Sequence, residues 1–128
     1  MSPNLLLRAL PLVAALVLTG APASAQNWLG LMRNTPAEQF NDEDVRLFNG
    51  SLDKALGDTP AGQSVRWENP KSENRGEIKV AKTFIWQDHA CRELRITNQA
   101  GDRKGDSVLN FCRVEDKWRA VSPSELKR

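Results

Sequence analysis

Apolar positions between residues 41 and 57 recur at the three- and four-residue spacing of a helix that buries one face. The recurring residues are Val45, Phe48, Leu52, Ala55 and Leu56. Asn41 is a suitable N-cap residue, and the acids at 42–44 complement the positive end of a helix dipole. Gly57 is a natural C-cap, and Pro60 prevents the helix from continuing. This pattern predicts one helix in the first half of the chain.

From the middle of the chain onward, the apolar positions alternate instead, which predicts half-buried strands. We expect five strands, at residues 65–68, 78–86, 90–97, 106–114 and 118–121. Ile78, Val80, Phe84 and Trp86 have one parity and should share one side of the second strand. Residues 98–105 are polar or small and predict a loop.

The two cysteines provide a test of this layout. If Cys91 faces Cys112 across an antiparallel strand pair, Leu94 lies beside Leu109, and one face of the pair is mostly apolar. A slip of one residue would destroy this segregation. The sequence therefore predicts an α+β fold, with one N-terminal helix packed on an antiparallel sheet of about five strands in meander order.

The start of the chain is typical of a secretory signal peptide. Arg8 supplies a positive charge, residues 10–18 are apolar, and Ala23-Ser24-Ala25 offers small residues at a cleavage site. The apolar run is shorter than the roughly 20 residues needed to span a membrane. We therefore expect cleavage after Ala25 and export to the periplasm.

The expected domain layout follows from the signal. It comprises a cleaved signal peptide at 1–25, a lead-in arm at 26–40, the α+β domain at 41–122 and a C-terminal tail at 123–128. The whole chain carries a formal charge of +2, and loss of the signal removes one basic residue. A nearly neutral exported domain gives no reason to expect nucleic acid as a partner. No later segment is apolar enough for a transmembrane anchor in the mature chain.

An even number of cysteines in an oxidising compartment predicts a Cys91–Cys112 disulfide. Closing a loop of this length stabilises the fold by roughly 3 kcal/mol in the chain-entropy model. A reduced pair serving metal or redox chemistry is the alternative, but no C-x-x-C spacing supports it.

Several short motifs resemble one family when they are read in order. They are Asp44 at a polar helix start, the segment 62–70 ending in Trp67-Glu68-Asn69-Pro70, Ser72, Gly76, Cys91-Arg92, Cys112-Arg113 and Trp118. This set resembles the C-terminal domain of the 17 kDa surface-antigen-like proteins of Gram-negative bacterial envelopes, over roughly residues 40–121. The resemblance implies an envelope location, leaves association with the outer membrane open, and brings no catalytic residues with it.

The chain also departs from the family pattern. Many such proteins are lipoproteins with a cysteine directly after the signal and a glycine-rich hydrophobic segment before the domain. Here Gln26 follows the signal, and the glycine-rich segment is missing. We therefore expect a soluble periplasmic form of the domain.

The candidate contacts for a partner or an anion are Arg92, Arg113, Trp118 and Arg119. In the register that the cysteines predict, Arg92 lies opposite Phe111 on the apolar face. One interpretation is structural, with the guanidinium stacked on an aromatic ring or paired with a carboxylate. The other is contact with an anionic ligand, such as a lipopolysaccharide phosphate or a peptidoglycan carboxylate.

No catalytic or metal site stands out. His89 is the only histidine, and the nearby Cys91 is expected in the disulfide, so we predict no metal and no cofactor. The leading hypothesis is a non-enzymatic envelope protein that binds another envelope protein or a cell-wall component. The alternatives are an inhibitor of a secreted hydrolase such as lysozyme, inserting the loop at 98–105, or a small periplasmic enzyme. The oligomeric state is left open.

Overall fold

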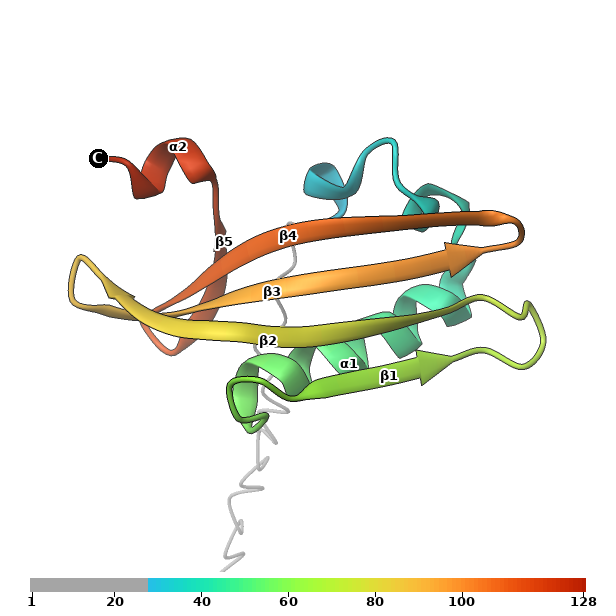
Figure 1. Cartoon of the computed structure of the whole chain (residues 1–128), viewed down its shortest axis with the longest axis horizontal. Helices are drawn as coiled ribbons and strands as arrows, with labels where there is room; N and C mark the ends of the chain where they lie inside the picture. Colours follow the sequence, from blue (N-terminus) through green and yellow to red (C-terminus); the bar gives the residue numbers. More distant parts are fainter. Residues whose placement is uncertain (1–27) are drawn as a thin grey trace, which may run out of the picture.

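The computed structural model describes residues 28–128, so the predicted signal peptide at 1–25 and its cleavage after Ala25 lie outside the described residues. One long helix, α1 (Asp42–Gly57), packs on one face of a five-stranded antiparallel sheet whose strands follow chain order (Figure 1). The strands are β1 (Ser64–Glu68), β2 (Arg75–Trp86), β3 (His89–Ala100), β4 (Arg103–Val114) and β5 (Lys117–Val121). The predicted α+β meander is confirmed.

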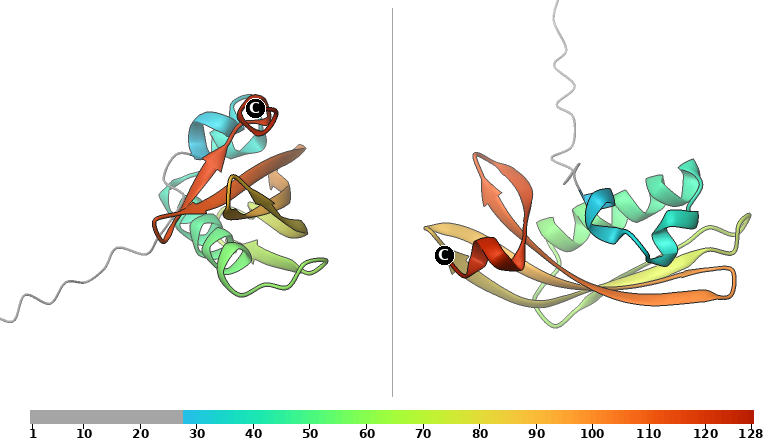
Figure 2. Two further views of the ribbon diagram at one scale, coloured as in Figure 1. Left: turned by 90° about the vertical axis from the view of Figure 1, so that its left-hand side faces the viewer. Right: turned by 90° about the horizontal axis from the view of Figure 1, so that it is seen from above.

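Short helical segments flank these elements. Two 3₁₀ turns, η1 (Trp28–Met32) and η2 (Pro36–Gln39), precede α1, and a single helical turn, α2 (Pro123–Leu126), follows β5. The sheet is strongly curved, and α1 lies on its concave side (Figure 2). We call the side that faces α1 the inner face and the opposite side the outer face.

The helix α1 begins where the sequence predicts. Asn41 Oδ1 accepts a hydrogen bond from the Asp44 N–H at 2.8 Å, and Asp44 Oδ2 accepts from the Asn41 N–H at 3.0 Å, forming a reciprocal capping box. The end differs by one residue from the prediction, because Gly57 is the last helical residue and Asp58 is the C-cap. The Gly57 backbone is not in the left-handed conformation for which glycine is favoured at helix ends. Its predicted role as the C-cap is therefore wrong.

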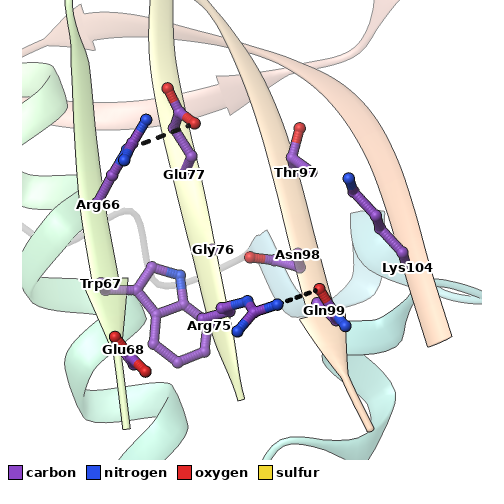
Figure 3. Close-up of a pocket in the computed structure, with 10 residues that line it drawn as sticks. All are labelled: Arg66, Trp67, Glu68, Arg75, Gly76, Glu77, Thr97, Asn98, Gln99 and Lys104. Atoms are coloured by element: carbon purple, nitrogen blue, oxygen red, sulfur yellow. Dashed lines mark hydrogen bonds and ion pairs between the residues drawn. The ribbon is translucent and has the colours of Figure 1, made fainter. Parts of the chain in front are cut away.

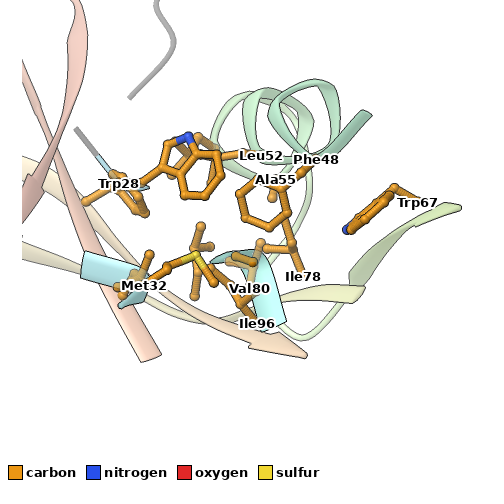
Figure 4. Packing of buried hydrophobic residues seen from close by; sticks show 14 residues of the cluster. Trp28, Met32, Phe48, Leu52, Ala55, Trp67, Ile78, Val80 and Ile96 are labelled. Atoms are coloured by element: carbon orange, nitrogen blue, oxygen red, sulfur yellow. The ribbon is translucent and has the colours of Figure 1, made fainter. Parts of the chain in front are cut away.

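The main hydrophobic core lies between α1 and the inner face of the sheet (Figure 4). Phe48, Leu52 and Ala55 are fully buried from the helix side, and Ile78 and Ile96 bury against them from the strands. The register across the sheet keeps these apolar side chains on one face, as period-two alternation requires. This core fixes the helix over the middle strands.

The residues that precede α1 add aromatic area to this core. Trp28 and Met32 are each 2% exposed, and the Trp28 ring centroid lies 4.4 Å from that of Phe48. The Trp28 indole N–H donates to Asn49 Oδ1 at 2.7 Å, so its polar atom is satisfied. The segment η1 is therefore packed against the helix rather than projecting from it.

The predicted pairing of β3 with β4 is confirmed along its whole length. Cys91 lies opposite Cys112, Leu94 opposite Leu109, and Arg92 opposite Phe111. The disulfide joins Cys91 to Cys112, and their Cα atoms lie 4.0 Å apart. The register therefore follows from the cysteine positions and the apolar alternation together.

The predicted loop at 98–105 is wrong. Asn98 pairs with Gly105 and Ala100 with Arg103, so β3 and β4 continue to a two-residue turn at Gly101 and Asp102. Gly101 has a φ of 58°, which a tight hairpin turn requires and glycine adopts without strain. The hydrolase-inhibitor alternative therefore loses the loop that was its candidate for an inserting segment.

The prediction that the apolar residues of β2 share one face is wrong for half of them. The β2–β3 register shifts between Val80 and Lys82, which marks a β-bulge at that point. Ile78 and Val80 belong to the main core, whereas Phe84 and Trp86 pack against the disulfide in a second cluster. One inserted residue thus turns the side chains of Phe84 and Trp86 from the inner face to the outer face.

Candidate functional site

A groove opens where α1 ends above the curved sheet, and we call it the helix-end groove. Its volume is about 440 Å³. Its lining comes from the end of α1, the β2–β3 hairpin and the β4–β5 hairpin: Leu56, Gly57, Thr83, Phe84, Ile85, Ala90, Cys91, Arg92, Arg113 and Trp118. Three of the four residues that the sequence singled out, Arg92, Arg113 and Trp118, therefore line one groove.

Arg92 connects the sheet to the helix. Its Nη1 donates to the main-chain carbonyl of Ala55 at 2.8 Å and to that of Thr59. These acceptors lie at the carbonyl end of α1, where a cation also complements the helix dipole. The partners of Arg92 are thus carbonyl oxygens, in place of the aromatic ring or the carboxylate that the structural interpretation expected. By these bonds, Arg92 holds the end of α1, which is one wall of the groove, against β3.

Arg113 and Trp118 form a cross-strand pair between β4 and β5. The Trp118 ring is half-buried against the main core, whereas Arg113 is exposed. The Arg113 guanidinium lies 3.5 Å from Asp116, whose side chain is 95% exposed. Such an exposed ion pair contributes little free energy, so Arg113 can exchange Asp116 for another anion at low cost.

The groove also exposes apolar area. Ile85, on the β2–β3 hairpin, is 72% exposed, which is unusual for so large an aliphatic side chain in the described part of the chain. The groove thus presents two apolar side chains, Ile85 and Trp118, beside one cation, Arg113. The arrangement suits a ligand that carries an apolar group next to an anionic group.

Arg119 does not reach this groove. Arg119 lies opposite Cys112 in the register of β4 and β5, so its side chain is on the outer face with the disulfide. The disulfide itself is buried beneath Phe84, Trp86 and Leu126. The four candidate residues therefore divide between two faces of the sheet.

A second hollow, of about 430 Å³, lies over β1, β2 and β3 near Gly76 (Figure 3). Two of its basic groups have partners within the hollow, since Arg66 pairs with Glu77 at 3.7 Å and Arg75 donates to Gln99 at 3.2 Å. A Cβ atom on Gly76 would lie 2.2 Å from Asn98 Oδ1, so glycine is required there. This hollow is the weaker candidate for a ligand with an apolar group, because its lining carries no large aliphatic side chain like the exposed Ile85 of the helix-end groove.

Sequence reasoning missed a buried carboxylate. Asp44 is fully buried at the start of α1, and the loop between β1 and β2 surrounds it. Asp44 Oδ1 accepts from Asn69 Nδ2 at 2.8 Å and from Ser72 Oγ at 2.6 Å, and Oδ2 accepts from Asn74 Nδ2 at 2.7 Å. We call these residues the Asp44 cage.

The cage sets the charge state of this carboxylate. Burial raises the pKa of Asp44, but the hydrogen bonds from Ser72, the Asn41 N–H, Asn74 and Asn69 outweigh burial, so the pKa lies below its ordinary value. The carboxylate is saturated with donors and has no accessible surface, which makes it a structural anchor. The cage brings together Asp44, Asn69 and Ser72, three residues of the motifs on which the resemblance was based.

The described residues, 28–128, contain no group of three or more metal-ligating side chains placed to hold an ion. No helix within that range is long and apolar enough to cross a membrane. His89 is the first residue of β3 and pairs with Trp86, beside the turn at Gln87 and Asp88.

The fold and the groove define a small disulfide-bonded α+β domain with a recess beside its helix. Known proteins resemble it in sequence. The chain is 33% identical to a 17 kDa surface antigen of Rickettsia felis over 85 residues, which is 65% of this chain and 54% of the relative. It is 30% identical to the 17 kDa surface antigen of Rickettsia prowazekii over 84 residues, 64% of this chain and 53% of the relative.

The 17 kDa surface antigen of Rickettsia conorii is 31% identical over 85 residues, with the same coverage as the first relative. These matches confirm the resemblance that the motifs indicated. The chain spans about half the length of the curated relatives it matches. No family model matches the chain, and no solved structure matches it.

Proposed function

We propose that this chain is a non-enzymatic protein of the bacterial cell envelope that acts by binding another envelope protein or a cell-wall component. The observation that carries the proposal is the helix-end groove, which brings exposed apolar area and a cation together in one recess. The names of the relatives, all surface antigens, support an envelope setting. The lining offers no arrangement of nucleophile and base that would favour an enzyme.

The chemistry of the groove narrows the partner. Trp118 and Ile85 would bury apolar area, and each fully buried aliphatic side chain is worth about 1.5–3 kcal/mol. Arg113 would pair with a carboxylate or phosphate, and a planar guanidinium favours a two-pronged contact. An acidic segment of an envelope protein or a carboxylate-bearing wall peptide meets both requirements.

Site-specific photo-crosslinking in living cells tests the contact. A photoreactive residue at position 85 should yield a discrete product, either with a protein or with wall material. The matched control is position 79, because Lys79 is exposed on the outer face of β2, away from the groove. Ile85→Ser and Arg113→Glu should weaken a product formed through a neighbouring groove position. A product equally abundant at both positions, or turnover of a wall-derived substrate by the purified protein, would contradict the proposal.

We also propose that the protein works in the periplasm after cleavage behind Ala25. The charged start, the apolar run and the small residues before Gln26 support this location. Fractionation of cells and intact mass of the recovered protein test it. The expected product is periplasmic and begins at Gln26, whereas cytosolic protein that retains Arg8 would show that the location is wrong.

A further inference from the structure

The edge of β4 is only partly covered. The last strand, β5, pairs with β4 through Asn110–Val114 alone, and then Pro123 begins α2 and leads the chain away. Residues 103–109 of β4 therefore have a strand neighbour on the β3 side and none on the other side (Figure 1).

The register shows which backbone groups point outward. Val80 directs its N–H and C=O toward the β1 side, where it donates to the Gln63 carbonyl at 2.9 Å and accepts from the Gly62 N–H at 2.7 Å. Leu94, opposite Val80, must then direct its groups toward Leu109, because the two bonding directions alternate along an antiparallel strand. The outward groups of β4 consequently belong to Lys104, Asp106 and Val108.

These outward groups have no partner within the described residues. No backbone or side-chain hydrogen bond outside the regular strand pairing reaches the main chain of Lys104, Asp106 or Val108. The side chains of all three are exposed, with Val108 at 54%. The segment is thus a regular row of free donors and acceptors.

Native edges are usually blocked by proline, a bulge, charged side chains such as lysine, or a covering helix or loop. The open part of β2 beyond Val80 shows such protection, because a bulge interrupts it and Lys82 follows. The open edge of β4 has neither proline nor bulge, and its pairing with β3 is unbroken. Its two exposed charges, Lys104 and Asp106, have opposite signs, so a strand of complementary charge is not repelled. This edge can therefore accept an additional antiparallel strand.

We propose that the added strand is the same edge of a second copy of this chain, joined across a two-fold axis that passes beside Gly105. In that register, Lys104 of each copy lies opposite Asp106 of the other, so the two strands form two equivalent ion pairs and each strand supplies one partner to each pair. The outward backbone groups of each Lys104 then meet those of the opposing Asp106, which completes ladder hydrogen bonds in both directions.

Neighbouring registers are disfavoured by the same residues. An axis at Asp106 sets two aspartates opposite one another, and an axis at Lys104 sets two lysines opposite one another. An axis at Ser107 sets Asp106 opposite Val108, which forms no ion pair, and sets Lys104 opposite Asn110, which already faces Val121 in β5. Charge and existing pairing therefore select one register. Because the contact is isologous, it closes at two copies and merges two sheets into one.

Sedimentation equilibrium of the protein recovered from cells tests this pairing. The wild-type chain should form a dimer, and Lys104→Asp or Asp106→Lys alone should each weaken dimerisation by about tenfold or more, because the symmetry applies each reversal twice. The double variant should regain the wild-type affinity. Lys79→Asp is the matched control, since it reverses an exposed charge on β2 and should leave the dimer unchanged.

A backbone variant provides an independent test. Asp106→Pro removes an N–H that points outward, so the fold should keep its backbone hydrogen bonds and lose only the exposed bond from Thr97 Oγ1 to the Asp106 side chain, while the dimer is lost. Far-ultraviolet circular dichroism would confirm that each variant is folded. A wild-type chain that stays monomeric at millimolar concentration would overturn the proposal, as would a dimer indifferent to both single reversals or a double variant that fails to recover.

Discussion

Replacing Asp44 with asparagine tests the importance of the Asp44 cage. The carboxylate accepts two hydrogen bonds at each oxygen, from Asn69 and Ser72 at one and from Asn74 and the Asn41 N–H at the other. An asparagine amide keeps one oxygen, but its NH₂ group faces two donors. Two buried donors would then lose their acceptor, at about 1–3 kcal/mol each. We expect Asp44→Asn to lower the free energy of unfolding by about 2–5 kcal/mol at pH 7.

The pH dependence of this loss has a definite sign. The pKa of Asp44 is lowered in the folded state because hydrogen bonds to the carboxylate outweigh its burial. A lowered folded pKa stabilises the fold above the unfolded pKa, which is about 4, and the stabilisation is lost as the pH falls through the folded value. Since asparagine does not titrate, the difference between wild type and variant should be complete above about pH 5 and narrow below about pH 4.

Urea unfolding followed by tryptophan fluorescence measures both effects across a pH series. Asp42→Asn is the control, because Asp42 is exposed in the first turn of α1 and lies outside the cage. It should change the unfolding free energy much less than Asp44→Asn. Equal midpoints for Asp44→Asn and wild type at pH 7, or a gap of constant size from pH 6 to pH 2, would refute the reasoning.

Three further substitutions have clear expected outcomes. Gly50→Ala should stabilise the protein by about 0.5–1 kcal/mol in urea unfolding, because the new methyl group meets nothing within 4 Å in mid-helix; a loss of stability would contradict this. Gly76→Ala should destabilise it by about 1–3 kcal/mol, since its Cβ would overlap Trp67 and Asn98; an unchanged melting temperature would count against this. Cys91→Ala with Cys112→Ala should cost about 3 kcal/mol, and a chain as stable as the oxidised wild type would disprove that contribution.

Local patterns predicted the helix and the sheet register well. The cap at Asn41 and the alternation around Leu94 are each encoded within a few neighbouring residues. The cysteine pair then fixed the long-range alignment, because only one register satisfies both the disulfide and the apolar face. Where short-range signals agreed with each other, the sequence was sufficient.

The predictions failed where distant residues determine the outcome. Asn98 looks like a loop residue, yet it is buried in a strand beside Gly76, whose missing side chain makes room for it. Asp44 resembles an ordinary acid in the first turn of a helix, and its three side-chain donors lie 25 to 30 residues away. The bulge after Val80 leaves no trace in the spacing of apolar residues, although it reverses their faces. Each case depends on a contact that spacing alone does not reveal.

The same limits apply to the helix-end groove. The positions of Arg92, Arg113 and Trp118 on the inner face follow from the register, so their shared location was within reach of the sequence. The exposure of Ile85 could not be predicted from the sequence, because it depends on how far the curved β2–β3 hairpin extends past the end of α1. Curvature is a property of the whole sheet.

The two hairpins that line the groove, β2–β3 and β4–β5, have very short turns. Each reverses direction through only two residues, Gln87–Asp88 and Glu115–Asp116, and all four have positive φ angles between 47° and 63°. Turns this short hold the flanking strands in a single geometry. A ligand would consequently meet walls that are already in place, and little conformational entropy would be lost on docking. The affinity for a ligand should therefore depend on the shape of the ligand more than on any conformational change of this protein.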